Sequence, residues 1–318
     1  METIKNKETI KKRALVISGG GSKGAWGGGI AHGLYDLENA RWVAYYGTST
    51  GSLLITLVAL EDFQKLKKAY TSVNTNNIFS VNPFNKKGKI NIWNAIWRLI
   101  RRKTSLGEAK KLKKKIKSMF SVREYNKLIE NGIKLCCNVT NYKNGKIVYI
   151  YNHDYDYCDY VDYTLASSSV PIAFKPLKTD KGIFLDGGVM ENIPIQKAIE
   201  DGADEIDIII HSPENYTDSG WRPDNMLDVA SRTLELMQRQ TAKSDVVIAK
   251  LMAQKDIRLN FYYTPRVLTK NVLDFDPVIM SAWWEEGYNS LKFTKEIVKE
   301  SYLLKRGKGK ARKIKSTI

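Results

Sequence analysis

An apolar run that ends at a glycine-flanked serine constrains this chain more than any other feature. Trp-Val-Ala-Tyr-Tyr at 42–46 is followed by Gly-Thr-Ser-Thr-Gly at 47–51 and by an apolar stretch at 52–57. The pattern predicts a buried strand, a tight turn and a helix. In such a nucleophile elbow the glycines allow close backbone approach, while the serine takes a strained conformation. Ser49 is therefore a candidate nucleophile; the alternative is a glycine-rich turn in which Ser49 caps the helix.

A second glycine-rich turn precedes the elbow. Residues 14–18 predict a short buried strand, and Gly-Gly-Gly-Ser-Lys-Gly at 19–24 leads into a predicted helix at 25–37. The turn lacks the Gly-Lys-Ser/Thr ending of a P-loop and the spacing of a dinucleotide fingerprint. Its amides are instead suited to an oxyanion hole, and adjacent parallel strands are expected to bring the turn opposite the serine. The candidate donors are the amides of Gly19, Gly20, Gly21 and Gly24.

A third strand end is also marked by glycines. Residues 182–185 predict a strand that leads into Asp-Gly-Gly at 186–188. An aspartate followed by glycines commonly forms only a turn. Asp186 is nevertheless the only carboxylate that the sequence places in such a setting, so it enters the candidate site beside the serine.

The rest of the chain alternates strands with helices. Further helices are predicted at 51–60, 62–73, 122–131, 164–171, 226–252 and 277–304, and another begins at 193. Further strands are predicted at 133–140, 146–151, 205–211 and 257–263. Asn144-Gly145 is typical of a hairpin turn. This alternation predicts an α/β fold, a three-layer sandwich with a mainly parallel central sheet.

A basic insertion at about 86–117 carries the strongest indication of a membrane contact. It holds thirteen Lys or Arg and one acid, and its apolar residues recur at 92, 93, 96, 97 and 100. Tryptophans and cations on one amphipathic helix are typical of an interfacial membrane segment. An ordinary surface helix that packs its tryptophans on the core is the alternative. The candidate membrane contacts are Trp93, Trp97, Arg101, Arg102 and Lys103.

Charge and composition limit the partners. The formal net charge of +17 favours a polyanionic partner, either nucleic acid or an anionic membrane surface, and the insertion favours the membrane. The basic segment 305–318 is expected to be a disordered tail that assists attachment. Missing signal and membrane-span patterns, together with three cysteines that suggest no disulfide framework, predict a cytoplasmic protein with peripheral membrane association. The sparse histidines predict no metal site, and no cofactor is expected.

Together the three glycine-marked blocks resemble the signature blocks of the patatin-like phospholipase family. They are Gly19-Gly20-Gly21-x-Lys23-Gly24, Gly47-x-Ser49-x-Gly51 and Asp186-Gly187-Gly188, in matching order and rough spacing. The stretches 166–171 and 189–194 are similar to two further family blocks. Lys23 stands where many members have arginine, a departure that leaves the glycine amides intact. The resemblance covers about residues 13–210 and places a hydrolase domain at 1–304.

The resemblance implies a lipid acyl hydrolase of the phospholipase A or lysophospholipase type. Ser49 is then the nucleophile and Asp186 the general base, with the backbone amides of Gly20 and Gly21 forming the oxyanion hole. A carboxylate in a dry site can have its pKa raised enough to accept the serine proton without a histidine. An acyl lipid is the implied substrate.

Three alternatives remain open. Ser49, Asp186 and His211 follow the chain order of an α/β-hydrolase triad, although that fold usually places several strands before the elbow. A non-catalytic basic protein that binds membranes or nucleic acid on a hydrolase scaffold would explain the charge. An acyltransferase would share the acyl-enzyme intermediate.

Overall fold

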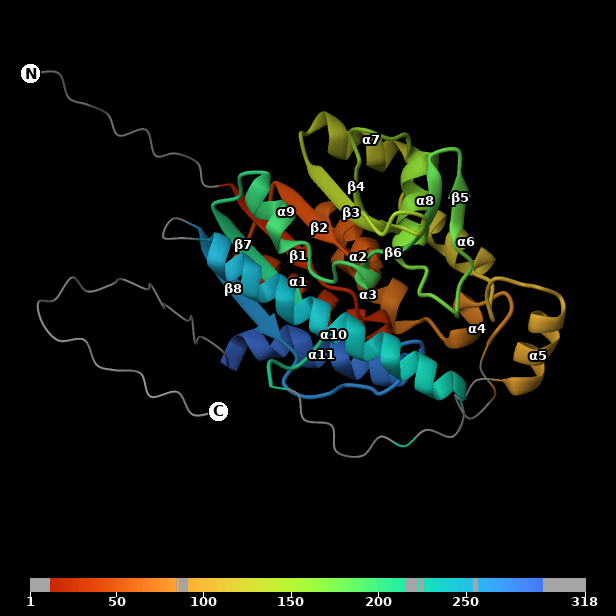
Figure 1. Ribbon diagram of the computed structural model, residues 1–318. Helices are drawn as coiled ribbons and strands as arrows, with labels where there is room; N and C mark the ends of the chain where they lie inside the picture. Colours follow the sequence, from red (N-terminus) through yellow and green to blue (C-terminus); the bar gives the residue numbers. More distant parts are fainter. Residues whose placement is uncertain are drawn as a thin grey trace, which may run out of the picture.

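The computed structural model describes residues 12–83, 85, 91–215, 222, 226–253 and 257–293. These residues contain an eight-stranded mixed sheet (Figure 1). The strands are β1 (Arg13–Ile17), β2 (Ala44–Gly47), β3 (Lys134–Asn141), β4 (Ile147–Tyr151), β5 (Leu177–Thr179), β6 (Gly182–Asp186), β7 (Glu205–Ile210) and β8 (Arg258–Tyr263).

The sheet is mostly parallel around its centre. Its strand order is β5-β6-β3-β2-β1-β7-β8, with β4 paired to β3. Strands β8, β7, β1, β2 and β3 run parallel. Strands β4 and β6 are antiparallel to β3, and β5 is antiparallel to β6. The predicted α/β fold with a mainly parallel sheet is confirmed, and one end of the sheet is antiparallel.

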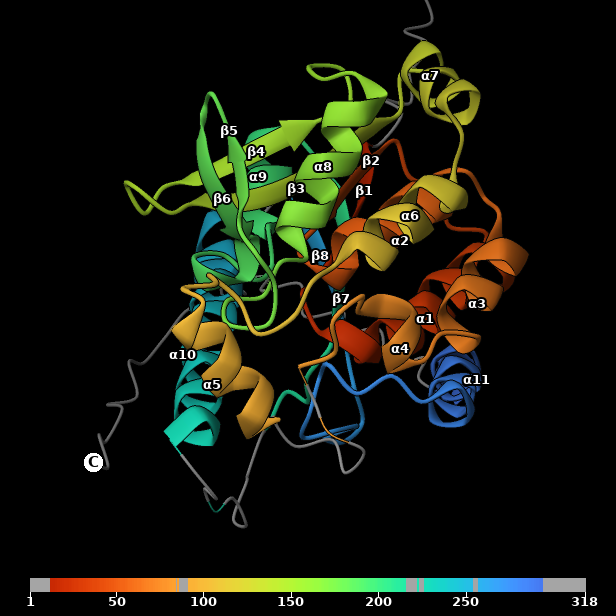
Figure 2. The same cartoon turned by 90° about the vertical axis from the view of Figure 1, so that its right-hand side faces the viewer.

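Helices cover both faces of the sheet. The first eight are α1 (Gly24–Leu37), α2 (Thr50–Ala59), α3 (Phe63–Thr71), α4 (Thr75–Ile78), α5 (Ile92–Ile100), α6 (Lys110–Met119), α7 (Val122–Glu130) and α8 (Tyr157–Ser167). The others in the described chain are α9 (Ile195–Glu200), α10 (Met226–Met252) and α11 (Pro277–Phe293). Figure 2 shows the layers edge-on, with α9 and α10 on one side of the sheet and α1, α3 and α11 on the other.

Alternation of side chains along the central strand builds the two cores. Leu15 and Ile17 point into the larger core beneath α1, α2 and α11, whereas Ala14 and Val16 point into the smaller core beneath α9 and α10. All four side chains are fully buried. A strand buried on both faces reads as a continuous apolar run, which is why the sequence marks β1 so clearly.

Several elements differ from the sequence prediction. The predicted helix at 164–171 is wrong in its bounds, because α8 begins at Tyr157, where Asp156 caps it by accepting the Asp159 amide. Helix α6 was not predicted, since its lysines conceal three buried residues at helical spacing, Leu112, Ile116 and Met119. Strand β5 was too short to recognise, and a single helical turn, α4, lies in a stretch expected to be a loop. The basic tail at 305–318 lies outside the described residues.

Candidate active site

The backbone of Ser49 has the conformation that a nucleophile elbow requires. Its φ of 54° and ψ of −122° are unusual for a residue other than glycine. The strained turn is held by serine hydroxyls around it: the Ser49 amide donates to Ser167 Oγ at 3.0 Å, and the Ser49 carbonyl accepts from Ser168 Oγ at 3.0 Å. A Cβ on Gly47 would lie 2.5 Å from the Gly51 backbone, so both flanking glycines are needed for this close approach.

Two strands that run toward each other bring Ser49 and Asp186 together. Gly47, the last residue of β2, pairs with Cys137, and Asp186, the last residue of β6, pairs with Val139. Because β4 occupies the other edge of β3 throughout this stretch, β2 and β6 share one edge of β3 and meet end to end. The antiparallel direction of β6, which the sequence did not reveal, therefore aims both strand ends at one point.

Asp186 is a buried carboxylate beside the elbow. Its side chain is about 1% exposed, and burial raises its pKa to about 7, against the opposing effects of the Gly188 amide and the Ser49 hydroxyl. Oδ1 accepts the Gly188 amide at 2.8 Å. Oδ2 has no partner of standard hydrogen-bond geometry among the described residues. The Ser49 hydroxyl is nevertheless close enough to the carboxyl group to lower its pKa. The unpaired Oδ2 is the atom able to accept a proton.

The glycine-rich turn lies against the elbow, as expected for neighbouring parallel strands. A Cβ on Gly19 would lie 3.3 Å from Ser49 Cβ. The Gly19 amide, however, donates to the Asn192 carbonyl at 3.2 Å, and the Gly24 amide donates to carbonyls of its own turn. Within the described chain, the amides of Gly20 and Gly21 have no backbone carbonyl partner. Of the four candidate glycines, Gly20 and Gly21 are therefore the two whose backbone amides are available to donate to an oxyanion.

His211 packs against the glycine turn. It does not have the contacts of a triad histidine. Its Nδ1 lies 3.0 Å from the Ser18 carbonyl, and its Nε2 lies 2.1 Å from the position of a Cβ on Gly27. Burial, reinforced by repulsion from Lys23, lowers the pKa of His211 to about 3, so the ring is neutral. Both ring nitrogens therefore face the β1 end and α1, and the Ser-Asp-His alternative loses its support.

Two residues that the sequence did not single out position the site. The Asn192 side chain fills the space between two glycines, because Cβ atoms on Gly19 and Gly188 would lie 2.4 and 3.1 Å from its Oδ1. Asp245 of α10 accepts the amides of Asn192 and Ile193, each at 2.9 Å, through one carboxylate oxygen. Asp245 lies 59 positions beyond Asp186 in the sequence, and no local motif marks it.

Two pockets meet at Ser49. The larger is a cavity of about 470 Å³ that includes Ser49, Asp186 and the glycine turn in its lining. The smaller, about 60 Å³, is lined mainly by apolar side chains. Its apolar lining residues include Leu53, Val73, Ile78, Leu112, Phe174 and Met280. The site therefore has a polar side and an apolar side, with the elbow between them.

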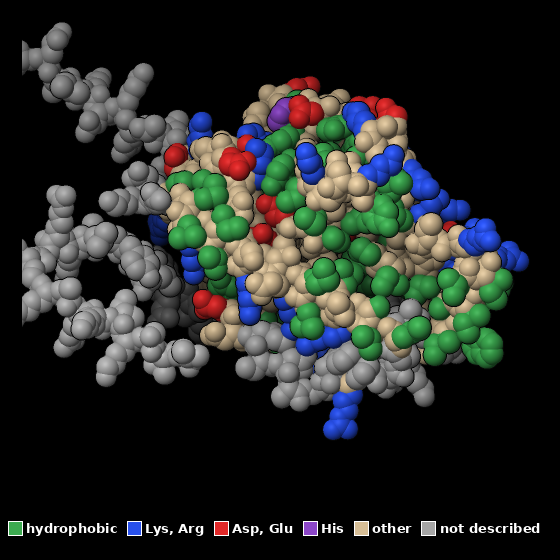
Figure 3. Space-filling model, viewed as in Figure 1, with side chains coloured by type: hydrophobic (Ala, Val, Ile, Leu, Met, Phe, Trp, Pro, Cys, Tyr) green, Lys and Arg blue, Asp and Glu red, His purple; other side chains and the backbone are tan. Residues whose placement is uncertain are grey.

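Helix α5 carries its tryptophans away from the core. Trp93 is 82% exposed and Trp97 48% exposed, and the Arg101 guanidinium lies 4.2 Å from the Trp97 ring centre. Arg98, in contrast, is buried, and its side chain donates to the Ser105 carbonyl and pairs with Glu108. The alternative of tryptophans packed on the core is wrong. Figure 3 shows apolar and basic side chains together at this end of the molecule.

Within the described residues, no group of three or more His, Cys, Asp or Glu side chains is arranged to hold a metal ion.

None of the helices described is both long enough and apolar enough to span a membrane. The membrane candidates Arg101, Arg102 and Lys103 are exposed at the end of α5.

The fold and the site define a three-layer α/β protein with a serine at a strained strand-to-helix turn. A family model described as "Patatin-like phospholipase" matches residues 15–199, more than half of the chain. The chain therefore belongs to the patatin-like phospholipase family, which confirms the resemblance inferred from its motifs.

Individual relatives are distant. The chain is 25% identical over 216 residues to "Probable lipid hydrolase 463L" of Invertebrate iridescent virus 6, a match that covers 66% of this chain and 68% of the relative. VipD from Legionella pneumophila is a solved structure with 14% identity and a TM-score of 0.49. That match covers 90% of this chain, which spans 66% of the VipD chain.

Proposed function

We propose that this protein hydrolyses fatty-acyl esters of membrane lipids through a Ser49–Asp186 dyad. The observation that carries the proposal is the end-to-end meeting of β2 and β6, which gives a strained serine a buried carboxylate with an unpaired oxygen. Membership of the patatin-like phospholipase family and a relative named as a probable lipid hydrolase support an acyl lipid as substrate.

The proposed reaction has two halves. Asp186 Oδ2 takes the Ser49 proton as Oγ attacks the ester carbonyl, and the amides of Gly20 and Gly21 stabilise the negative oxygen that develops. The lipid alcohol leaves with the proton from Asp186, which produces an acyl-enzyme. A water molecule then gives a proton to Asp186 as its oxygen attacks the acyl carbonyl. The bond from the acyl carbon to Ser49 Oγ breaks, Asp186 returns the proton to Ser49, and the fatty acid is released.

We further infer that α5 attaches the protein to an anionic membrane surface. The exposed Trp93 and Trp97 and the basic residues after them support this contact, since indoles favour the headgroup region and cations favour anionic lipid. Peripheral attachment of this kind would present the active site to its substrate.

Fatty-acid release from anionic phospholipid vesicles, with a chelator present, tests the catalytic proposal. Wild-type protein should release fatty acid, whereas Ser49→Ala and Asp186→Asn should each lower the rate by on the order of 10³-fold. Ser72→Ala removes a hydroxyl that only contacts the Lys68 carbonyl at the end of α3, and it serves as the matched control. Activity retained by Ser49→Ala, or abolished by the chelator, would refute the proposal.

A further inference from the structure

The larger cavity carries a group of charges that the hydrolytic mechanism does not use. Among its described lining residues, the acids are Asp186 and Glu235. The basic residues in the same lining are Lys23, Arg222, Arg232, Arg239 and Lys270. Since Asp186 belongs to the dyad, Glu235 faces an excess of positive charge.

Glu235 is held between two arginines of its own helix. Its Oε2 lies 2.7 Å from Arg232 Nη1, and its Oε1 contacts Arg239. The three residues lie at i−3, i and i+4 on α10, so they share one helix face. Among the described residues, a single carboxylate thus lies between two guanidinium groups on this face of α10.

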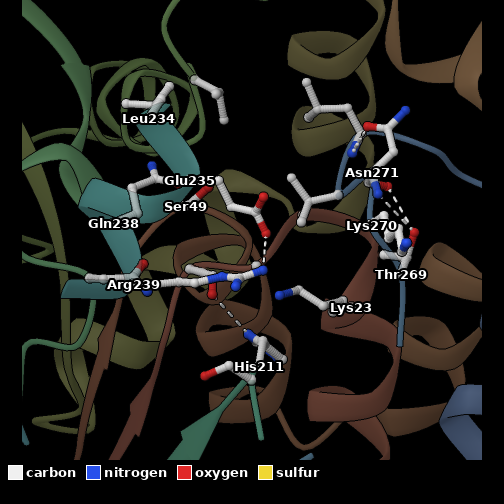
Figure 4. A pocket seen from close by; sticks show the side chains of 18 of the residues that line it. Lys23, Ser49, His211, Leu234, Glu235, Gln238, Arg239, Thr269, Lys270 and Asn271 are labelled. Carbon is white, nitrogen blue, oxygen red and sulfur yellow. Dashed lines mark hydrogen bonds and ion pairs between the residues drawn. The ribbon is translucent and has the colours of Figure 1, made fainter. Parts of the chain in front are cut away.

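Lys23 adds a third cation from the opposite wall. Figure 4 shows its side chain extending toward Glu235 and Arg239 across the cavity. Burial lowers the pKa of Lys23 to about 8. The attraction of Glu235 opposes this shift, and the weaker repulsion of Arg239 adds to it. Lys23 lies within the glycine-rich turn at 19–24, and it lines the same cavity as Ser49, so the positive cluster lies on the wall of the cavity that contains the proposed reaction centre.

We propose that Lys23, Arg232 and Arg239 form a subsite for a phosphate group and that it selects lipids with a net anionic headgroup. The inference rests on the proposed function and adds the substrate class. Guanidinium groups bind phosphate oxygens through paired hydrogen bonds, and a concave positive site concentrates anions. With the phosphate in this subsite and the acyl chain toward the apolar pocket, the ester lies between them at Ser49.

The same geometry disfavours a zwitterionic headgroup. A choline or ethanolamine group needs an acidic or aromatic partner. Glu235 is already neutralised by Arg232 and Arg239, and the described residues of the cavity lining include no Phe, Tyr or Trp. From the described lining residues, a quaternary or primary ammonium would therefore meet mainly positive charge, whereas a phosphate monoester adds negative charge without an ammonium.

Mixed micelles of a neutral detergent test the selectivity at constant surface charge. In the wild type, kcat/KM for phosphatidic acid should be about thirtyfold or more higher than kcat/KM for phosphatidylcholine. Arg239→Gln should lower this ratio about tenfold, and Glu235→Gln should raise it. Arg258→Gln removes an arginine near Glu205 at the start of β8, outside the cavity lining, and should leave the ratio unchanged.

Misfolding cannot shift the kcat/KM ratio in opposite directions in Arg239→Gln and Glu235→Gln. The two ratios therefore decide the proposal. A ratio near one in the wild type, or the same ratio in Arg239→Gln as in wild type, would overturn it. A fall in the ratio for Glu235→Gln would also contradict the proposal, because removal of the carboxylate should favour phosphate binding.

Calorimetry on Ser49→Ala separates a headgroup site from a site for free phosphate. Glycerol 3-phosphate and a short-chain phosphatidic acid should bind, with the lipid at least about tenfold tighter because its acyl chain is also buried. Inorganic phosphate binding as tightly as the lipid would overturn the headgroup assignment. If the wild type hydrolyses no lipid but the lipid binds Ser49→Ala and not its Arg239→Gln derivative, the hydrolase proposal fails while the phosphate subsite stands.

Discussion

The backbone amide of Gly19 donates a hydrogen bond to the carbonyl of Asn192 at 3.2 Å. This contact ties the turn after β1 to the segment after β6, so the two halves of the candidate site share one support. Asp245 extends the support to α10, because it accepts the amides of Asn192 and Ile193.

Asp245→Ala should weaken both the fold and catalysis. It leaves two amides without their acceptor, which should lower the free energy of unfolding by about 1–3 kcal/mol and kcat by about tenfold or more. Asp245→Asn keeps an acceptor oxygen and should recover most of kcat. Chemical unfolding and ester hydrolysis measure the two effects, and an unchanged kcat in Asp245→Ala would show that the support is not needed for catalysis.

Gly20→Ala should damage the glycine turn directly. The new Cβ would lie 2.5 Å from His211 Cβ, which should lower the free energy of unfolding by about 1–3 kcal/mol and displace the candidate oxyanion donors. Gly28→Ala collides with the Trp284 ring at 2.4 Å, away from the turn, and controls for the loss of stability. At a temperature where both variants are folded, Gly20→Ala should lose far more activity than Gly28→Ala. Equal losses of activity would contradict the proposed role of the turn.

The activity should depend on the ionisation of Asp186. Because the carboxylate must be ionised to accept the Ser49 proton and burial raises its pKa to about 7, kcat/KM should fall about tenfold per pH unit below about pH 7. Above that pH it should level off. A soluble short-chain ester gives this profile without membrane effects, and a profile that is flat from pH 5 to 8 would argue against Asp186 as the base.

The same pKa shift predicts that Asp186→Asn stabilises the protein at neutral pH. The folded-state pKa of about 7 exceeds the ordinary value of 3.8, so the unfolded chain loses this proton first as the pH rises, and native stability falls between about pH 4 and pH 7. Asparagine removes that effect, so the stability of Asp186→Asn relative to wild type should rise by on the order of 4 kcal/mol between pH 4 and pH 8. Denaturant titrations at both pH values measure it, with the exposed Asp180→Asn as control. A relative gain that does not grow with pH would contradict the shift.

Membrane attachment should depend on the face of α5. Trp93→Ser removes an indole that is 82% exposed and should weaken binding to anionic vesicles about tenfold. Tyr142→Ser removes an aromatic side chain that is 68% exposed at the β3–β4 hairpin, and it should leave binding unchanged. Vesicle co-sedimentation compares the two, and equal losses would show that α5 is not a specific contact.

Local sequence patterns predicted the central part of the fold. The glycine-marked ends of β1, β2 and β6 were recognisable because close backbone approach restricts those positions to small residues. The direction of β6 was not predictable, since an isolated strand does not reveal which neighbour it pairs with or in which sense. Helix α6 was concealed for another reason: its exposed lysines dominate the composition, while only Leu112, Ile116 and Met119 pack inward.

The candidate site was predicted as a set of motifs, but its supporting contacts were not. Asp245 and Asn192 act through hydrogen bonds and packing between distant segments, and these depend on how α10 crosses the sheet. The burial of Arg98 was likewise concealed, because a basic residue on a basic helix reads as a surface residue until its partners, the Ser105 carbonyl and Glu108, are brought beside it.

Residues on either side of α5 also form part of the cavity wall. Pro83 precedes α5 and Leu106 follows it, and both line the larger cavity, while the Leu106 amide is tied to the Ile172 carbonyl at 2.7 Å. A bilayer held at α5 would therefore lie next to the rim of the reaction chamber. With α5 attached as proposed, a lipid would have a short path from the leaflet into the cavity that holds Ser49, and less of its apolar surface would have to pass through bulk water.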